Sequence, residues 1–191
     1  MKILAINGSP HKNGNTVKLI NQIFRGARKN NHSCEIIHLV DLHLDYCNWC
    51  GECYETGVCP IDDGFQEHLK NIFGANLLIV ATPSSTRSVT GYMKNWLDRF
   101  CNSQLIYEVD EKKNVNKQSR VPKGKKGIII VQGCTDKFQE TLEPINVVMV
   151  NLEIPVIERL IVPNVGLTEQ DTVDKKPEVM HRAFKIGQKL I

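Results

Sequence analysis

The sequence predicts an α/β fold, a doubly wound, five-stranded parallel sheet (order 2-1-3-4-5) with helices on both faces. Three observations lead to this prediction. Five short apolar runs occur along the chain, amphipathic segments with helical spacing alternate with them, and the runs themselves are almost continuously apolar. Strands that alternate with helices indicate βαβ units. Continuously apolar strands are typical of a sheet that is covered on both faces.

The expected strands cover residues 2–7, 35–40, 77–82, 127–132 and 155–161. Apolar residues at helical spacing predict helices over residues 16–29, 92–105, 137–152 and 178–190. Pro144 must begin, kink or split the third of these helices. Ligands of such sheets bind beyond the carboxyl ends of the strands, at the topological switch point. Candidate site residues are therefore expected after the first, third and fourth strands.

Composition limits the class of protein. The chain has 191 residues, of which 41% are hydrophobic and 24% charged, so one domain over 1–191 is expected. A net charge of +3 indicates no nucleic-acid partner. No stretch reaches about 18 apolar residues, so no membrane span is expected. Asn7-Gly8 interrupts the first apolar run too early for a signal peptide, which favours a cytoplasmic protein.

Two segments are predicted to lack regular structure. One is a cysteine-rich loop at about 45–64, and the other is a basic loop at about 109–127 that carries seven Lys or Arg residues. The basic loop is interpreted as a solvated, mobile surface. The alternatives are a contact with a partner or a site for a phosphorylated nucleotide.

The loop after the first strand, residues 8–16, has the chemistry of an anion site. Glycines let the backbone approach a ligand, Ser9, Asn15 and Thr16 supply donors, and the following helix offers free N–H groups. The loop matches neither the Walker A pattern nor G-x-G-x-x-G. The alternative is an ordinary turn into a helix that is capped by Thr or Asn.

Four cysteines form the most specific motif, Cys47-x2-Cys50-x2-Cys53-x5-Cys59, followed by Pro60. Structural zinc usually takes pairs of cysteines that lie farther apart, and disulfides are not expected in a reducing cytoplasm. Cysteines at x2 spacing, with a later one before proline, are typical of a [4Fe–4S] cluster. Zinc and an empty or degraded site remain the alternatives.

The other three cysteines are scattered. Cys34 and Cys101 are interpreted as small core residues, and Cys134, after the fourth strand, as either a cofactor contact or a packing residue.

The segment after the third strand, residues 82–94, suits a flat ring. Its small and hydroxyl residues let a ring pack against backbone, and Thr90 or Gly91 is expected to cap the next helix. Gly133, directly after the fourth strand, is a further candidate for a cofactor contact. Together with a phosphate site after the first strand, these segments outline a site for an elongated mononucleotide such as FMN.

Three stretches carry a family resemblance: KILAINGSPHKNGNT, the cysteine run through Asp62-Asp63, and ATPSSTRSVTGYMKNWLDRF. They resemble the NADPH-dependent FMN reductase family over roughly residues 1–160, and the cysteine loop is similar to that of its iron–sulfur flavoproteins. The resemblance implies a flavodoxin-like fold, bound FMN and a homo-oligomer (dimer or tetramer) with the cluster loop near a subunit contact. It implies that a [4Fe–4S] cluster is held by Cys47, Cys50, Cys53 and Cys59.

The resemblance also implies the flavin contacts. The family's phosphate loop corresponds to Ser9, His11, Asn13, Asn15 and Thr16, and its flavin-ring segment to Pro83, Ser84, Ser85, Thr86 and Arg87.

The chain departs from the family at both segments. His11 replaces the usual Arg, so a permanent positive charge beside the phosphate is replaced by one that depends on pH. Ser85 and Thr86 replace two aromatic residues, which opens the ring site, and Arg87 replaces a small residue.

The main functional hypothesis is an FMN-dependent oxidoreductase that passes electrons through a [4Fe–4S] cluster between a reduced donor and a small-molecule or protein acceptor. The first alternative is an NAD(P)H-dependent FMN or quinone reductase with a structural or vestigial cysteine loop. The second is a non-enzymatic redox sensor or binding module. Because the cofactors supply the chemistry, no catalytic acid or base is assigned.

Overall fold

The protein is described by a computed structural model, which covers residues 1–168 and 171–191. Five parallel strands form the central sheet in the order β2-β1-β3-β6-β7. These strands are β1 (Lys2–Asn7), β2 (Ser33–His38), β3 (Leu77–Pro83), β6 (Lys126–Gln132) and β7 (Val156–Val162). The doubly wound α/β fold of the flavodoxin type is therefore confirmed.

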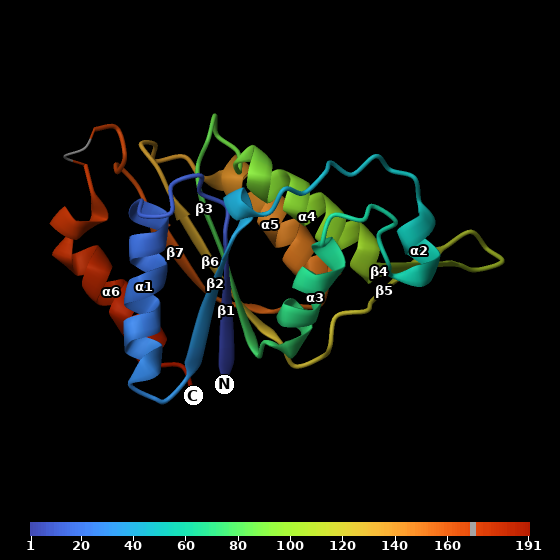
Figure 1. The fold of residues 1–191 in the computed structure, drawn as a ribbon, viewed down its shortest axis with the longest axis horizontal. Coiled ribbons are helices and arrows are strands. Elements are labelled where there is room, and N and C mark those ends of the chain that lie inside the picture. Colours follow the sequence, from blue (N-terminus) through green and yellow to red (C-terminus); the bar gives the residue numbers. More distant parts are fainter. Residues whose placement is uncertain (169–170) are drawn as a thin grey trace.

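Helices cover both faces of the sheet (Figure 1). One face carries α1 (Asn15–Arg28) and α6 (Pro177–Gln188); the other carries α3 (Phe65–Gly74), α4 (Gly91–Gln104) and α5 (Gln139–Asn151). The remaining elements are η1 (Leu39–Asp41), α2 (Glu52–Thr56), β4 (Leu105–Val109), β5 (Val115–Ser119) and η2 (Val173–Lys175). Among the described residues, no helix combines the length and apolar character needed to cross a membrane.

The apolar strands are explained by two cores. Successive residues of a strand point to opposite faces, so Leu4 and Ile6 enter the core under α3, α4 and α5. Ile3 and Ala5 enter the core under α1 and α6. All four side chains are fully buried. A strand buried on both faces has no polar face, which is why the runs read as continuous rather than alternating.

The sheet strands keep the predicted relative order, but the chain contains more strands than predicted. The prediction that residues 109–127 form an irregular basic loop was wrong. Most of this segment belongs to the antiparallel hairpin β4–β5 and to the start of β6. The Asp110 carboxylate accepts hydrogen bonds from the Lys112 and Asn114 amides (2.9 and 2.8 Å) and so shapes the tip of the hairpin. Two further helices, α2 and α3, were also not predicted.

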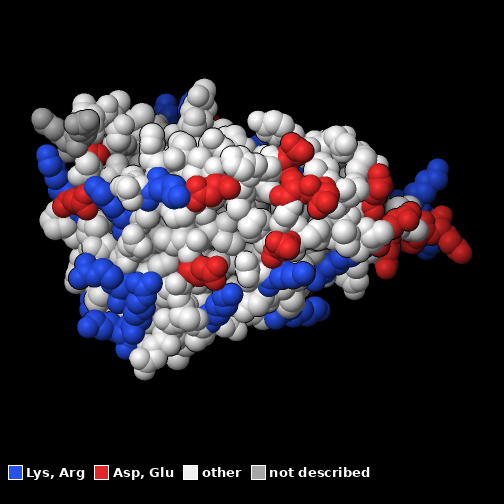
Figure 2. Space-filling view, viewed as in Figure 1, with Lys and Arg blue, Asp and Glu red and all other residues white. Residues whose placement is uncertain are grey.

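The basic residues of the hairpin segment have different roles. The hairpin projects from the body beside α2 (Figure 1), and acidic and basic side chains lie together at this end of the molecule (Figure 2). Two of the seven basic residues are structural instead. Lys125 is buried and donates to the Phe73 and Ala75 carbonyls at the end of α3, and burial lowers its pKa. Arg120 binds backbone carbonyls of the cysteine loop.

Pro144 lies inside α5 and does not end it, so the possibility that it splits the helix was wrong.

Candidate functional site

The N-terminus of α1 has no side-chain cap. Its N-cap residue is Gly14, in extended backbone, and no acidic residue lies in the first turn. The interpretation of a Thr-capped or Asn-capped turn was therefore wrong. Uncapped first-turn N–H groups, at the positive end of the helix dipole, form a ready site for a phosphate.

The preceding loop is held in shape by Asn7 and Ser9. The Ser9 amide donates to the Asn7 carboxamide oxygen (3.1 Å), and the Ser9 hydroxyl accepts from the His11 amide (3.1 Å). Ser9 is buried, whereas His11 and Asn13 are exposed. The structure therefore places a buried hydroxyl and two exposed polar side chains around the same helix terminus.

The other two predicted phosphate residues lie on α1 itself. The buried Thr16 hydroxyl accepts from the Gln132 carboxamide (3.2 Å), which joins the end of β6 to this terminus. The Asn15 carboxamide accepts from the Val173 amide (3.1 Å) and donates to the Asp171 carbonyl (3.4 Å). Asn15 thus holds the C-terminal segment with its side chain.

The segment after β3 is bound to the ends of neighbouring elements. The Ser84 amide donates to the Gln132 carbonyl (2.7 Å), and its hydroxyl shares a hydrogen bond with that of Thr141 (2.8 Å). A side chain at Gly133 would place its Cβ 3.2 Å from Ser84 Cβ. The structure thus brings Pro83, Ser84 and Gly133 together at the carboxyl edge of the sheet.

A tight turn follows at Ser85. The amides and carbonyls of Ser85 and Ser88 exchange two hydrogen bonds (2.8 and 2.9 Å), while Thr86 and Arg87 have φ values of 49° and 60°. Positive φ at both central residues is the pattern of a type I′ turn, which normally favours Asn and Gly. A β-branched threonine here is strained, and strain of this kind is frequent at ligand sites. Arg87 forms an ion pair with Glu140 of α5.

A cleft of about 520 Å³ lies at the switch point between β1 and β3. Such a volume is ordinary for a small-molecule site. Of the predicted site residues, Ser85 lines it, next to Pro10, Thr90 and Gly91. Tyr92, which also lines it, belongs to the predicted segment 82–94. The rest of the wall was not predicted and comprises Leu39, Val40, Leu42, His43, Leu44, Tyr46 and Asn95.

The expected cap of α4 is confirmed. The Thr90 hydroxyl accepts from the Met93 amide (3.2 Å) and donates to the Gly8 carbonyl (2.6 Å). This residue therefore locks the start of α4 onto the end of β1, beside the cleft.

The four clustered cysteines surround one small cavity. Cys47, Cys50, Cys53 and Cys59 all line it, together with apolar and aromatic neighbours that include Tyr54. Burial, and then the adjacent thiols, raises the pKa of Cys53. Among residues 1–168 and 171–191, no group of three or more His, Cys, Asp or Glu side chains has the geometry to hold a metal ion. The structure brings the thiols together, but not as a single-ion site.

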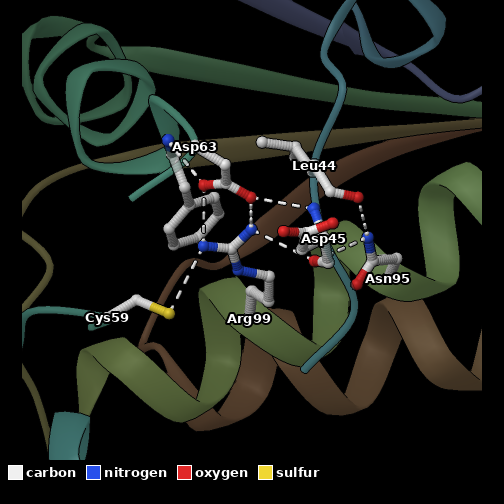
Figure 3. Close-up of polar contacts among 7 residues, drawn as sticks. Leu44, Asp45, Cys59, Asp63, Asn95 and Arg99 are labelled. Atoms are coloured by element: carbon white, nitrogen blue, oxygen red, sulfur yellow. Dashed lines mark hydrogen bonds and ion pairs between the residues drawn. The ribbon is translucent and has the colours of Figure 1, made fainter. Parts of the chain in front are cut away.

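A buried ion pair closes the cysteine loop (Figure 3). The Arg99 guanidinium of α4 is fully buried and binds both carboxylate oxygens of Asp63. The Asp63 carboxylate also accepts from the Asp45 amide (2.8 Å), at the opposite end of the loop. Burial alone would raise the pKa of Asp63, but hydrogen bonds from Arg99 and from the Asp45 and Phe65 amides hold it below its usual range.

Arg99 also contacts Cys59, one of the four cysteines predicted to bind the cluster. Its Nη2 donates to Cys59 Sγ (3.3 Å), its Nη1 donates to the Asp45 carbonyl (3.2 Å), and its guanidinium lies 4.3 Å from the centre of the Phe65 ring. No role for Arg99 was predicted. The available signal was a charged residue on the apolar face of a helix, three residues after the buried Trp96.

A second arginine holds the other side of the loop. Arg120 donates to the carbonyls of Tyr54 and Glu55 in α2 (2.8 and 2.9 Å) and to that of Leu105 in β4 (2.9 Å). The rings of Tyr54 and Tyr107 also meet edge to face at 5.2 Å. The hairpin β4–β5 therefore supports α2, which contains Cys53.

The remaining cysteines lie elsewhere. Cys34 and Cys101 are half-buried and pack against the two cores, which confirms a packing position for both. Cys134 is exposed.

Helix α4 connects the two parts of the site. Thr90 and Gly91 at its start line the cleft, and Arg99 and Asn102 in its second half reach the cysteine cavity. At 1.5 Å per residue, Gly91 and Arg99 are separated by roughly 12 Å along the helix. The cleft and the cavity are therefore neighbours in one chain.

The comparisons with known proteins decide the family. Residues 1–164 match the model of the NADPH-dependent FMN reductase family. The chain belongs to this family. An iron–sulfur flavoprotein from Archaeoglobus fulgidus is 39% identical over 99 residues, 52% of this chain and 48% of the relative. An iron–sulfur flavoprotein from Methanocaldococcus jannaschii is 34% identical over 99 residues, 52% of this chain and 51% of the relative. The matches thus span about half the length of these curated relatives.

Solved structures agree in fold. An NAD(P)H:quinone oxidoreductase from Methanothermobacter marburgensis superposes with a TM-score of 0.74 at 15% identity, over 100% of this chain and 99% of that chain. A flavone reductase superposes with a TM-score of 0.72 at 21% identity, over 98% of this chain and 61% of that chain. At these identities the likeness establishes the shared fold alone.

Proposed function

We propose that this family member is an FMN-dependent oxidoreductase in which a [4Fe–4S] cluster exchanges electrons with the flavin. The observation that carries the proposal is the convergence of Cys47, Cys50, Cys53 and Cys59 on one cavity beside the cleft at the switch point. The family assignment and the names of the curated relatives support it. A reduced donor supplies the electrons, and a small molecule or a redox protein accepts them.

FMN fits the first part of the site. The uncapped amides of α1, with Ser9, His11, Asn13 and Thr16 around them, would hold the phosphate. Ser85, which lines the cleft, would hold the flavin ring together with the neighbouring residues of its turn and of the sheet edge, Pro83, Ser84, Thr86, Arg87 and Gly133. Bound FMN supplies hydride acceptance and one-electron transfer, and this chain supplies its position and hydrogen-bond donors.

The chemistry of the cysteine cavity suits a cluster, because four cysteines with the spacing typical of a [4Fe–4S] site line it. Structural zinc usually takes pairs of cysteines that lie farther apart in the sequence. The four cysteines would hold the cluster, and Arg99 and Arg120 keep their loop in place.

NAD(P)H is the electron donor that we propose, on the strength of the family description. The same observation favours the second candidate function, an NAD(P)H-dependent flavin or quinone reductase whose cysteine loop is structural. We also propose, from length and composition, that the chain is a single cytoplasmic domain, and, from the resemblance, that it acts as a homo-oligomer.

Cysteine substitutions separate the two candidates. Cys50→Ala is expected to lose more than about 90% of the bound iron and sulfide after anaerobic reconstitution, because a cluster ligand is missing. Cys134→Ala, which changes an exposed cysteine outside the cavity, is the matched control and should retain both. Full iron binding by Cys50→Ala would contradict the cluster. NADPH oxidation that persists unchanged in Cys50→Ala, with quinone as acceptor, would favour the second candidate.

His11→Arg is expected to tighten FMN binding about fivefold, roughly 1 kcal/mol. The substitution adds a permanent charge at an exposed position of the phosphate loop, where charge-assisted hydrogen bonds are partly screened. Titration of the flavin fluorescence measures the affinity. Riboflavin, which lacks the phosphate, is the control and should bind both proteins equally. An equal gain for riboflavin would place the phosphate elsewhere.

A further inference from the structure

We propose that Arg99 is a positioning residue whose hydrogen bond to Cys59 raises the reduction potential of the cluster, while its ion pair with Asp63 fixes the loop. This inference rests on the proposed cluster. It concerns a residue of α4, outside the cysteine motif.

The guanidinium is arranged to reach sulfur. Nη1 donates to Asp63 and to the Asp45 carbonyl, and Nη2 donates to Asp63 and to Cys59 Sγ. These contacts use all four terminal N–H groups. The bidentate ion pair with Asp63 fixes the plane of the guanidinium, so the remaining Nη2 proton is directed at the sulfur.

Burial makes the contact electrostatically strong. The Arg99 side chain has no exposed surface and that of Asp63 has 8%. Phe65 covers one face of the guanidinium, with its ring centre 4.3 Å away. Water screens a charge less in such a place than at the surface, so the donor acts on the sulfur more strongly than an exposed donor would.

A second donor lies on the same side of α4. Asn102 Nδ2 is 3.8 Å from Cys47 Sγ, one helical turn after Arg99. The helix that carries the edge of the flavin cleft therefore presents N–H groups to two of the four thiols.

The direction of the effect follows from charge. Reduction adds negative charge to the cluster, and hydrogen bonds to its sulfurs stabilise that charge. Loss of a charged donor should therefore lower the potential. Loss of the Asp63 carboxylate should raise it, because the Arg99 charge is then no longer balanced.

Redox titration with EPR detection of the reduced cluster tests the proposal. Arg99→Gln is expected to decrease the ratio of reduced to oxidised cluster about tenfold at a fixed applied potential, ~59 mV for one electron. Asp63→Asn should shift the potential in the opposite direction. Arg120→Lys is the matched control: Arg120 also holds the loop but donates only to carbonyls, so the potential should not change.

Each outcome decides a separate point. Wild-type potentials in Arg99→Gln, or equal shifts in Arg99→Gln and Asp63→Asn, would overturn the role of Arg99. If Arg99→Gln holds no iron, the shift in Asp63→Asn decides alone. Loss of iron from both variants but not from Arg120→Lys would make the ion pair a purely structural closure and overturn the proposal. Wild-type protein without iron and sulfide would overturn the proposed function itself.

Discussion

Arg99→Met is expected to lower the free energy of unfolding by about 3–5 kcal/mol, the cost of removing one partner from a buried ion pair. Methionine keeps much of the apolar stem of Arg99 but not the guanidinium that lies over the Phe65 ring, so the loss comes mainly from the unpaired Asp63 carboxylate and partly from that ring contact. Urea unfolding under anaerobic conditions measures the difference. Arg87→Met is the matched control, because its ion pair with Glu140 is exposed and should contribute less than about 1 kcal/mol. Similar losses in both variants would contradict the account of the buried pair.

The ion pair between Arg99 and Asp63 also predicts that the free energy of unfolding depends on pH in the acid range. The pKa of Asp63 is lower in the folded protein than the value of about 3.9 in an unfolded chain. Its stabilising contribution is therefore fully present above about pH 4 and is lost as the pH falls through the folded pKa. In Asp63→Asn this part of the acid dependence should be missing, which pH-dependent urea unfolding would show. Parallel profiles for the two proteins would contradict the prediction.

Gly187→Ala is expected to destabilise the protein by at least about 3 kcal/mol, the upper end of overpacking effects. Helices α1 and α6 cross at Gly26 and Gly187, and a Cβ on Gly187 would meet the Ile23 carbonyl oxygen and lie 2.8 Å from the Ala27 amide. Both obstacles are backbone atoms, so the helices must separate rather than a side chain rotate.

Gly74→Ala is the control for that prediction. Gly74 ends α3 and has no atom within 4 Å of an added Cβ, so the change should be neutral or stabilising by up to about 1 kcal/mol. Thermal unfolding compares the two variants. A Gly187→Ala protein as stable as wild type would contradict the close approach of α1 and α6.

The sheet could be predicted because its signal is local. The three inner strands β1, β3 and β6 are apolar runs with residues such as Ile79 buried on one face and Val80 on the other, and turns or helices separate the runs. The edge strands β2 and β7 are partly exposed. Helix α3 carried a similar signal, since Phe65, Leu69 and Ile72 recur at helical spacing and are buried. It was missed because the segment follows directly on the cysteine loop. In the hairpin, strand β5 lacked such a signal, because its residues after Val115 are polar and nearly all of Val115–Ser119 is exposed.

The candidate site also has parts that could be predicted from local sequence and parts that could not. The cysteine spacing and the loop after β1 are contiguous in sequence and could be recognised. The Arg99 interactions join α4 to Asp45, Cys59 and Asp63, residues that come together only through the packing of the cysteine loop on that helix. The wall of the cleft formed by residues 39–46 also depends on where the chain turns after β2. Such contacts have no periodicity that a single segment could show.

One chain is proposed to hold FMN and a [4Fe–4S] cluster in adjacent sites. The most direct test is an absorption spectrum of anaerobically prepared wild-type protein, with iron, sulfide and FMN quantified on the same sample. We expect about four irons, four sulfides and one FMN per chain. Colourless protein, or protein that carries FMN without iron and sulfide after reconstitution, would contradict it.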